Sequence, residues 1–152
     1  MSGRSLVTPL LAAVLVAGCG GTDGKDEFGK GFKPVNSELV ALGSGVGKAL
    51  QDAPRTSDQE LARRFVGFVT RLQGIKARIV KLDPPGDLEP QVRRLSSAAS
   101  RLVVDLGGIA AAASRHDRQA FRTAVAALVR DSPAAGDARR ALARETGAAV
   151  GP

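Results

Sequence analysis

The chain has 152 residues, 43% of them hydrophobic, and a formal net charge of +7 at pH 7. This length and composition are those of a single globular domain with its own apolar core. Because it has one cysteine, one histidine and one methionine, an intrachain disulfide, a c-type haem attachment and a zinc site of several His and Cys ligands are all excluded.

The N-terminus has the features of a signal peptide. One basic residue, Arg4, precedes an apolar run from Leu6 to Ala17, which is shorter than the roughly 20 residues that cross a bilayer. We therefore expect residues 1–18 to be removed on export. The rest of the chain stays basic without Arg4, and outside the cytoplasm the expected counterparts of this charge are anionic lipid head groups, acidic wall polymer or an envelope protein, not nucleic acid.

The apolar run ends in small residues that lead into the single cysteine, in the order Val16, Ala17, Gly18 and Cys19. This sequence resembles the lipobox of bacterial lipoproteins, which more often has Leu where this chain has Val16. The resemblance implies that the Cys19 thiol receives a diacylglyceryl group, that the chain is cut before Cys19, and that acyl chains such as palmitate hold the protein on the extracytoplasmic side of the cell membrane. The alternative is an ordinary secretory signal followed by a free thiol.

Residues 19–36 are polar and glycine-rich, without a periodic apolar face, and this composition predicts a flexible, lipidated tether. In an alternative arrangement the stretch lies on the lipid surface, because Phe28 and Phe32 alternate with lysines. We favour the tether, since the acidic residues between Asp23 and Glu27 cancel the charge of those lysines.

The helical domain is expected over residues 37–150, and its first helix is expected to be short. Ser37 is the predicted N-cap. One face then carries Leu39, Leu42, Val46 and Leu50. Three glycines interrupt the same segment, at Gly43, Gly45 and Gly47. Because each costs about 1 kcal/mol relative to alanine inside a helix, we expect about 14 residues of frayed helix, with an irregular segment as the alternative.

Two long amphipathic helices follow. The first begins at a capping box formed by Ser57 and Glu60 and ends at Pro84-Pro85. Its apolar residues recur at steps of four and three, at Leu61, Phe65, Phe68, Leu72, Ile75, Ile79 and Leu82. The second has Asp87 as its predicted cap, and its apolar residues follow the same steps, at Leu88, Val92, Leu95, Ala99, Leu102, Leu106, Ile109 and Ala113. The short connection between them predicts an antiparallel hairpin.

A last helix is predicted from the cap at Asp117, with a break or kink near Pro133. The pattern as a whole indicates an all-α, up-down four-helix bundle with a short first helix and a kinked last helix. His116 lies immediately before this cap and is expected to be an exposed turn residue.

The helix lengths predict an apolar groove. A short first helix would enter the bundle at the end far from Pro84-Pro85 and leave the other half without a fourth wall. The groove would be lined by Ile75, Ile79, Leu82, Leu88 and Val92. The alternative is that the tether or the last helix covers these residues, because large exposed apolar patches are rare in monomers.

One charged surface stands out. Arg64, Arg71 and Arg78 recur every seven residues, so they form a stripe along one helix, about 10.5 Å apart, a spacing that suits an extended anion. The alternative is a solvated face whose arginines are neutralised by acidic residues of neighbouring helices, such as Asp105 or Glu145.

No arrangement of acids, bases and nucleophiles indicates an enzyme, and no cofactor is expected. The helical part resembles small uncharacterised lipoproteins of high-GC bacteria, a resemblance that implies no activity. The sequence favours a non-enzymatic interaction or structural module anchored in the cell envelope. The alternative is a carrier that holds a lipid or small apolar ligand in the bundle.

Overall fold

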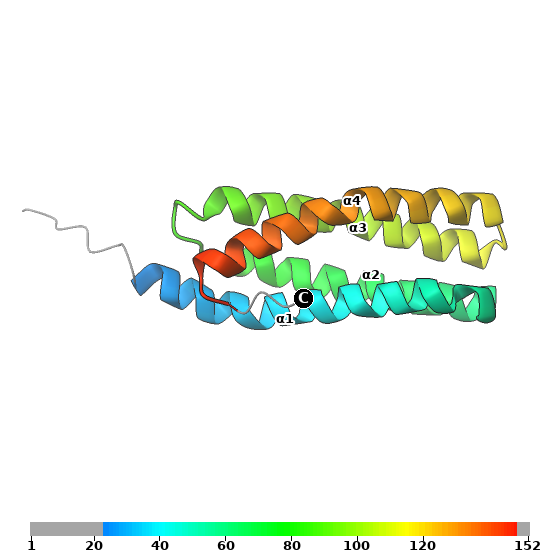
Figure 1. The fold of residues 1–152 in the computed structure, drawn as a ribbon, viewed down its shortest axis with the longest axis horizontal. Coiled ribbons are helices and arrows are strands. Elements are labelled where there is room, and N and C mark those ends of the chain that lie inside the picture. The colour runs from blue at the N-terminus through cyan, green and yellow to red at the C-terminus, as the bar shows by residue number, and fades with distance from the viewer. Residues whose placement is uncertain (1–22, 149–152) are drawn as a thin grey trace, which may run out of the picture.

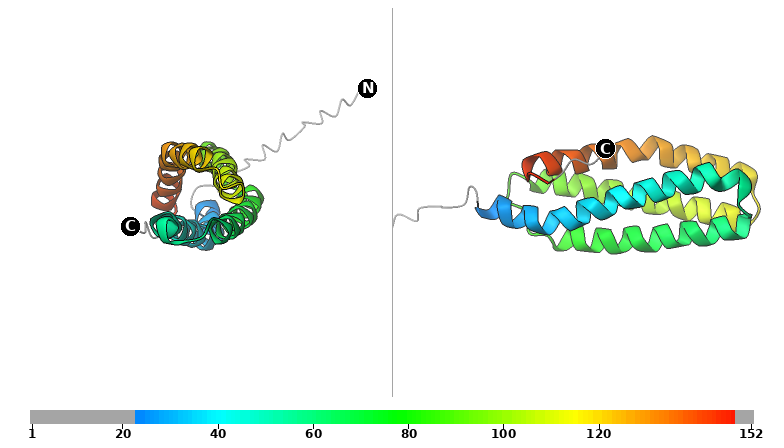
Figure 2. Two further views of the ribbon diagram at one scale, coloured as in Figure 1. Left: turned by 90° about the vertical axis from the view of Figure 1, so that its right-hand side faces the viewer. Right: turned by 60° about the horizontal axis from the view of Figure 1, so that its bottom comes forward.

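The computed structural model describes residues 23–148, which form an antiparallel bundle of four long helices (Figure 1). The helices are α1 (Asp23–Asp52), α2 (Asp58–Lys81), α3 (Glu89–Ser114) and α4 (Arg118–Glu145), and a 3-10 turn, Ala53–Arg55, joins α1 to α2. Seen along its axis, the bundle surrounds one core (Figure 2). The predicted all-α four-helix bundle is confirmed.

Of the two N-caps predicted for the α2–α3 hairpin, the one at the start of α2 is present and the one at the start of α3 is not. Ser57 caps α2, because its Oγ accepts a 3.3 Å hydrogen bond from the backbone N–H of Glu60. The predicted cap of α3 is wrong: Leu88 occupies the N-cap position and provides no side-chain bond. Asp87 instead binds Lys25 of α1, with 2.6 Å between Oδ2 and Nζ, so a contact between helices takes the carboxylate that the sequence assigned to the cap.

The expectation of a short first helix after a tether is wrong. α1 has 30 residues and includes residues 23–36 of the predicted tether. Ser37 is not an N-cap, since it lies inside α1 and its Oγ donates to the carbonyl of Lys33. The cause is an apolar stripe that begins well before Leu39. At alternating steps of four and three it comprises Phe28, Phe32, Val35, Leu39, Leu42, Val46 and Ala49, all buried or packed against the core.

Three glycines allow α1 to approach its neighbours closely. A Cβ on Gly29 would lie 3.1 Å from the carbonyl oxygen of Thr146, one on Gly31 3.0 Å from Leu82 Cδ2, and one on Gly45 3.3 Å from Phe68 Cε1. Such distances are shorter than most contacts of a real Cβ, so an added side chain would force its neighbour to shift, least easily at Gly29, where the neighbour is backbone. The glycines of residues 19–36 led to the prediction of a flexible tether, but Gly29 and Gly31 instead allow close packing of a helix.

α4 is one continuous helix. Asp117 caps it as predicted, because its Oδ1 accepts a 2.9 Å hydrogen bond from the N–H of Ala120. Pro133 lies inside the helix and does not end it, and beyond this region α4 slants toward α1 (Figure 1). Pro133 is exposed, so water can solvate the carbonyl that loses its helical hydrogen bond.

The four helices do not pack equally. α3 packs closely along both α2 and α4, whereas α1 packs mainly on α2 and meets α4 at few points. By length and composition α3 is the one described helix that could cross a membrane, and 44% of its most apolar stretch is buried in the bundle. Central helices of bundles have the same properties, so this observation assigns no membrane span.

Candidate functional site

The lipobox residues Val16, Ala17 and Gly18 and the lipidation residue Cys19 lie outside the described residues. Their assignment rests on the sequence. The structure adds one relevant fact: α1 already begins at Asp23, so only residues 20–22 separate Cys19 from the bundle.

The predicted apolar groove near Pro84-Pro85 is not open. Ile75, Ile79 and Leu88 are at most 1% exposed. Val92 is also buried, and Leu82 is packed against the core. The reason is the early start of α1, whose Phe28 and Phe32 stack at a centroid distance of 5.8 Å and occupy the fourth side of the bundle. A shallow hollow between α2 and α3 still has Leu82 and Val92 in its wall.

The predicted arginine stripe on α2 is partly neutralised. Arg78 forms a bidentate pair with Glu38 of α1. Arg64 Nε donates to Glu60 Oε1 at 3.0 Å. Arg71 is exposed, and its charge also acts on Glu38. The hydrogen bonds from Arg78, with the charges of Arg78 and Arg71, hold the pKa of Glu38 below its usual value. The neutralising residues are thus Glu38 and Glu60, where the sequence suggested Asp105 or Glu145.

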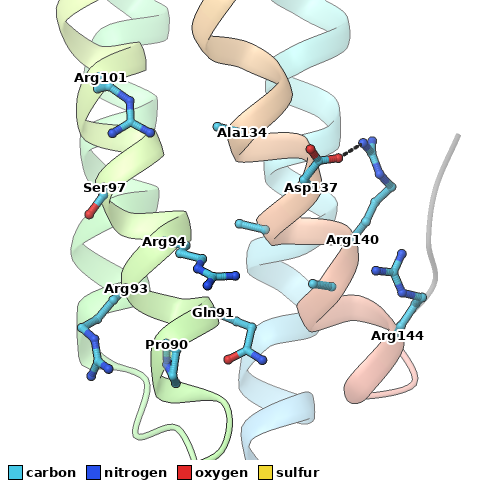
Figure 3. A pocket seen from close by; sticks show the side chains of 12 residues that line it. Pro90, Gln91, Arg93, Arg94, Ser97, Arg101, Ala134, Asp137, Arg140 and Arg144 are labelled. Carbon is cyan, nitrogen blue, oxygen red and sulfur yellow. Dashed lines mark hydrogen bonds and ion pairs between the residues drawn. The ribbon is translucent and has the colours of Figure 1, made fainter.

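A different basic surface lies between α3 and α4. We call it the arginine groove; it has a volume of about 820 Å³ and is hollowed between the start of α3 and the end of α4 (Figure 3). Its basic residues are Arg93, Arg94 and Arg101 of α3 and Arg140 and Arg144 of α4. The one acidic residue in its lining is Asp137. In Figure 3, Arg94 extends from α3 toward α4.

Two of these five arginines are already paired. Arg93 Nη1 lies 2.7 Å from Glu89 Oε2, and Arg140 Nη2 lies 2.6 Å from Asp137 Oδ1. Among residues 23–148, Arg94, Arg101 and Arg144 have no ion pair, and all three are exposed. Because guanidinium groups bind carboxylate and phosphate through paired N–H donors, this groove has unused capacity for an anion.

Sequence reasoning missed the arginine groove because no single helix contains it. Arg94 and Arg101 repeat at seven residues on α3, and Arg140 and Arg144 at four on α4, so each pair lies on one helix face. That signal was present. Which faces meet depends on the antiparallel packing of α3 on α4, which the sequence of either helix alone does not show.

A buried carboxyl group lies further along the same helix pair. Asp105 Oδ2 is buried and has no hydrogen-bond partner. Burial and the nearby charge of Asp131 raise the pKa of Asp105, against the opposing effect of Arg130 and Arg101. Arg130 pairs with Asp131 at 3.0 Å, which keeps that guanidinium directed at Asp131. Asp105 therefore holds its proton more readily than an ordinary carboxyl group does.

His116 lies in the α3–α4 turn, as predicted. Its side chain is 73% exposed, its φ is 56°, and its Nδ1 is 2.7 Å from Asp58 Oδ2. This contact ties the turn to the start of α2. Within residues 23–148 there is no group of three or more His, Cys, Asp or Glu side chains that could hold a metal ion.

The chain was compared with protein-family models, curated proteins and solved structures, and nothing in any of the three comparisons matches it.

Proposed function

We propose that the chain is a lipid-anchored protein of the cell envelope and that its bundle is a non-enzymatic module that binds anionic lipid head groups through the arginine groove. Cys19 is the proposed point of lipid attachment, on the extracytoplasmic side of the cell membrane. The observation that carries the proposal is the presence of three exposed arginines without ion pairs among the described residues, Arg94, Arg101 and Arg144, in one groove with two further arginines.

The position of the groove supports head groups as its counterpart. Lys25 in the first turn of α1 lies 2.6 Å from Asp87, just before α3, and 3.8 Å from Glu145, at the end of α4. The start of α1 therefore adjoins the end of the bundle that holds Arg94 and Arg144. The four peptide steps from Cys19 to Asp23 span at most about 14 Å, so an anchor at Cys19 would keep this end beside the lipid.

A non-enzymatic role is supported by the chemistry available. The described residues include one histidine, His116, which is exposed and bound to a carboxylate. Beside the half-buried carboxyl of Asp105 lies Asp131, whose two carboxylate oxygens accept hydrogen bonds from Arg130. General acid–base or nucleophilic catalysis needs such groups within hydrogen-bonding reach of one another in a site.

Vesicle binding tests the proposal. Residues 19–152 carrying Cys19→Ser would be mixed with vesicles of phosphatidylglycerol and phosphatidylcholine, and with vesicles of phosphatidylcholine alone, and sedimented. We expect binding to the anionic vesicles only. Arg94→Gln combined with Arg144→Gln should weaken it by about thirtyfold, since each basic residue near an anionic surface contributes about 1 kcal/mol.

Arg55→Gln combined with Arg115→Gln is the matched control. It removes the same charge from two exposed arginines near the opposite end of the bundle, and it should leave binding nearly unchanged. Equal losses of vesicle binding in both double variants would show a general effect of net charge and would contradict binding through the arginine groove. Binding to an acidic wall polymer in preference to anionic vesicles would replace lipid by polymer as the counterpart.

The alternative function is a carrier of a lipid or small apolar ligand. The residues predicted for its groove, near Pro84-Pro85, are buried by α1. A carrier would therefore have to hold its ligand in another part of the bundle.

A further inference from the structure

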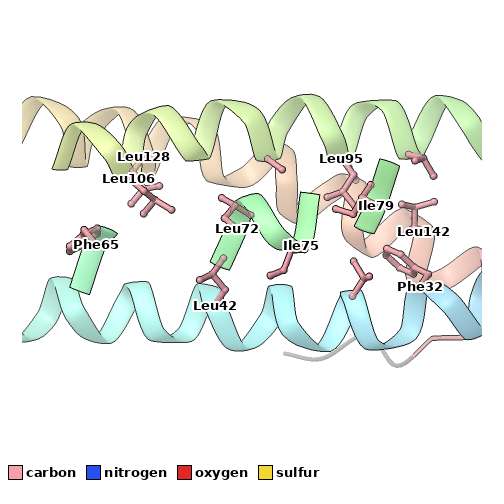
Figure 4. Packing of buried hydrophobic residues seen from close by; sticks show 14 of the residues in the cluster. Phe32, Leu42, Phe65, Leu72, Ile75, Ile79, Leu95, Leu106, Leu128 and Leu142 are labelled. Carbon is pink, nitrogen blue, oxygen red and sulfur yellow. The ribbon is translucent and has the colours of Figure 1, made fainter. Parts of the chain in front are cut away.

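The seam between α1 and α4 contains an apolar groove. It has a volume of about 360 Å³, within the range of small-molecule pockets. Side chains from all four helices line it, among them Leu42 and Val46 of α1, Leu72 of α2, Leu102 and Leu106 of α3 and Leu128 of α4. Figure 4 shows Leu42, Leu72, Leu106 and Leu128 converging between the helices.

Small residues keep this groove open to the surface. Gly43 of α1 and Ala135 and Gly136 of α4 are part of its lining. A Cβ on Gly43 would meet no atom within 4 Å, so the space next to α1 is unfilled at that point. The opening follows from the packing of the bundle, in which α1 meets α4 at few points.

The groove also contains a buried cation. Arg139 is 8% exposed, and its Nη1 donates a 2.9 Å hydrogen bond to Oδ1 of Asn36. Burial and the neighbouring charge of Arg140 lower the pKa of Arg139. Among residues 23–148, no carboxylate lies within ion-pair distance of this guanidinium. A buried charge without a counter-ion is costly, and arginine does not lose its proton in proteins.

We propose that the α1–α4 groove binds a long-chain fatty acid, with the acyl chain along the leucines and the carboxylate on Arg139. The ligand would supply the anion that the described residues do not offer to Arg139, and its methylenes would cover apolar surface at the opening. This site is separate from the arginine groove, so either proposal can fail without the other.

Calorimetric titration with dodecanoate, below its micelle concentration, tests the proposal against 1-dodecanol, which has the same chain without the charge. The full mature chain should bind dodecanoate at least about tenfold more tightly than the alcohol, since a hydrogen bond to a charged group is worth about a factor of ten or more. Arg139→Gln should remove this preference and leave alcohol binding in place. Equal affinity for acid and alcohol, or an unchanged preference in Arg139→Gln, would overturn the proposal.

Two glycines of α1 provide a steric test that does not depend on Arg139. Gly43→Phe should fill the opening and weaken both ligands by at least about tenfold. Gly47→Phe is the matched control, because Gly47 also has no atom within 4 Å of its Cβ position but does not line the groove. Its affinities should stay within about twofold of the parent. Circular dichroism establishes that both variants are folded, and equal effects of the two would overturn the site.

A second readout separates binding from a structural role. If Arg139 is an uncompensated buried charge in the free protein, Arg139→Met should leave the unfolding temperature unchanged or raise it. A large decrease would mean that Arg139 supports the fold and would count against the proposal. A chain ending at Ala148 should bind dodecanoate as the full chain does. Binding only after that truncation would identify the C-terminal segment as the occupant of the groove.

Discussion

A Cβ atom built on Gly29 would lie 3.1 Å from the carbonyl oxygen of Thr146 and 3.2 Å from its Cβ. Gly29 is in the second turn of α1, and Thr146 is the C-cap of α4. The backbone of the two helices is therefore in contact where the sequence predicted a flexible tether. Both of these Thr146 atoms belong to the end of α4, where the Thr146 N–H donates a hydrogen bond to the carbonyl oxygen of Leu142. Thr146 therefore has little freedom to move away from an added methyl group.

Gly29→Ala should therefore destabilise the bundle. Alanine favours a helix over glycine by about 1 kcal/mol, but the added methyl group meets backbone, and overpacking costs about 1–3 kcal/mol. We expect a net loss, measured as a lower urea midpoint with an unchanged slope of the free energy of unfolding.

Gly43→Ala is the control for this variant. It makes the same chemical change on the same helix, with no atom within 4 Å of the new methyl group. It should stabilise the protein by up to about 1 kcal/mol. If Gly29→Ala were equally stabilising, α1 would not pack on the end of α4.

Phe32→Ala tests whether residues 23–36 belong to the core. Phe32 is fully buried, next to Phe28 and in the same core cluster as Leu142. Truncation of a buried phenylalanine costs about 3–5 kcal/mol, a large fraction of the 5–15 kcal/mol typical of a domain. Thermal unfolding should show a strong decrease in midpoint. Lys33→Ala, at the adjacent exposed residue, should change the unfolding midpoint little. If both variants had equally small effects, residues 23–36 would not belong to the core and the predicted tether would be correct.

The sequence predicted the bundle well where its signals were local. The steps of four and three in α2 and α3, and the caps at Ser57 and Asp117, are properties of single segments, and the structure confirms them. The first helix was predicted too short because the polar, glycine-rich composition of residues 19–36 outweighed an apolar stripe that already begins at Phe28. Tertiary contacts decide that competition, since most helical stability in proteins comes from packing.

The candidate sites were less predictable for a related reason. The arginine stripe on α2 was visible in the sequence, but its neutralisation by Glu38 depends on α1 lying alongside α2. The arginine groove needs the register of α3 against α4, and the contact of Arg139 with Asn36 needs α4 to lie against α1. These relationships lie between helices, so the periodicity within one helix does not show which faces meet.

Asp105→Asn should raise stability at neutral pH. Because the folded state raises the pKa of Asp105, the folded protein holds this proton more tightly than the unfolded chain. The resulting stabilisation is present at low pH and is lost as the pH rises through the raised pKa. Asparagine keeps the shape without the charge, so its advantage over the parent should appear above that pKa and vanish in acid.

Unfolding free energies measured at several pH values between about 3 and 8 check this prediction. Asp131→Asn is the comparison, because Arg130 hydrogen-bonds Asp131 and lowers the pKa of that carboxylate. Loss of the Asp131 charge should lower the free energy of unfolding near neutral pH, and this effect should be smaller in acid. The same pH dependence in both variants would contradict the environment assigned to Asp105.

If Cys19 is acylated as proposed, Cys19→Ser should leave a protein whose membrane attachment depends on salt. Acyl chains bind through their buried methylenes, each worth about 0.8 kcal/mol, and this contribution is insensitive to ionic strength. The arginine groove acts through charges that are screened within about 8 Å at physiological ionic strength and about 3 Å at 1 M. In detergent partitioning of whole cells, the parent should enter the detergent phase and Cys19→Ser the aqueous phase.

The two contributions should also be separable on isolated membranes. With acyl chains attached, the start of α1 is held within about 14 Å of the lipid, so weak contacts from Arg94 and Arg144 at the same end of the bundle act at a high effective concentration. Washing with 1 M salt should release Cys19→Ser and leave the parent bound. If Cys19→Ser stayed in the membrane fraction after the wash and in the detergent phase, the lipid assignment would be wrong.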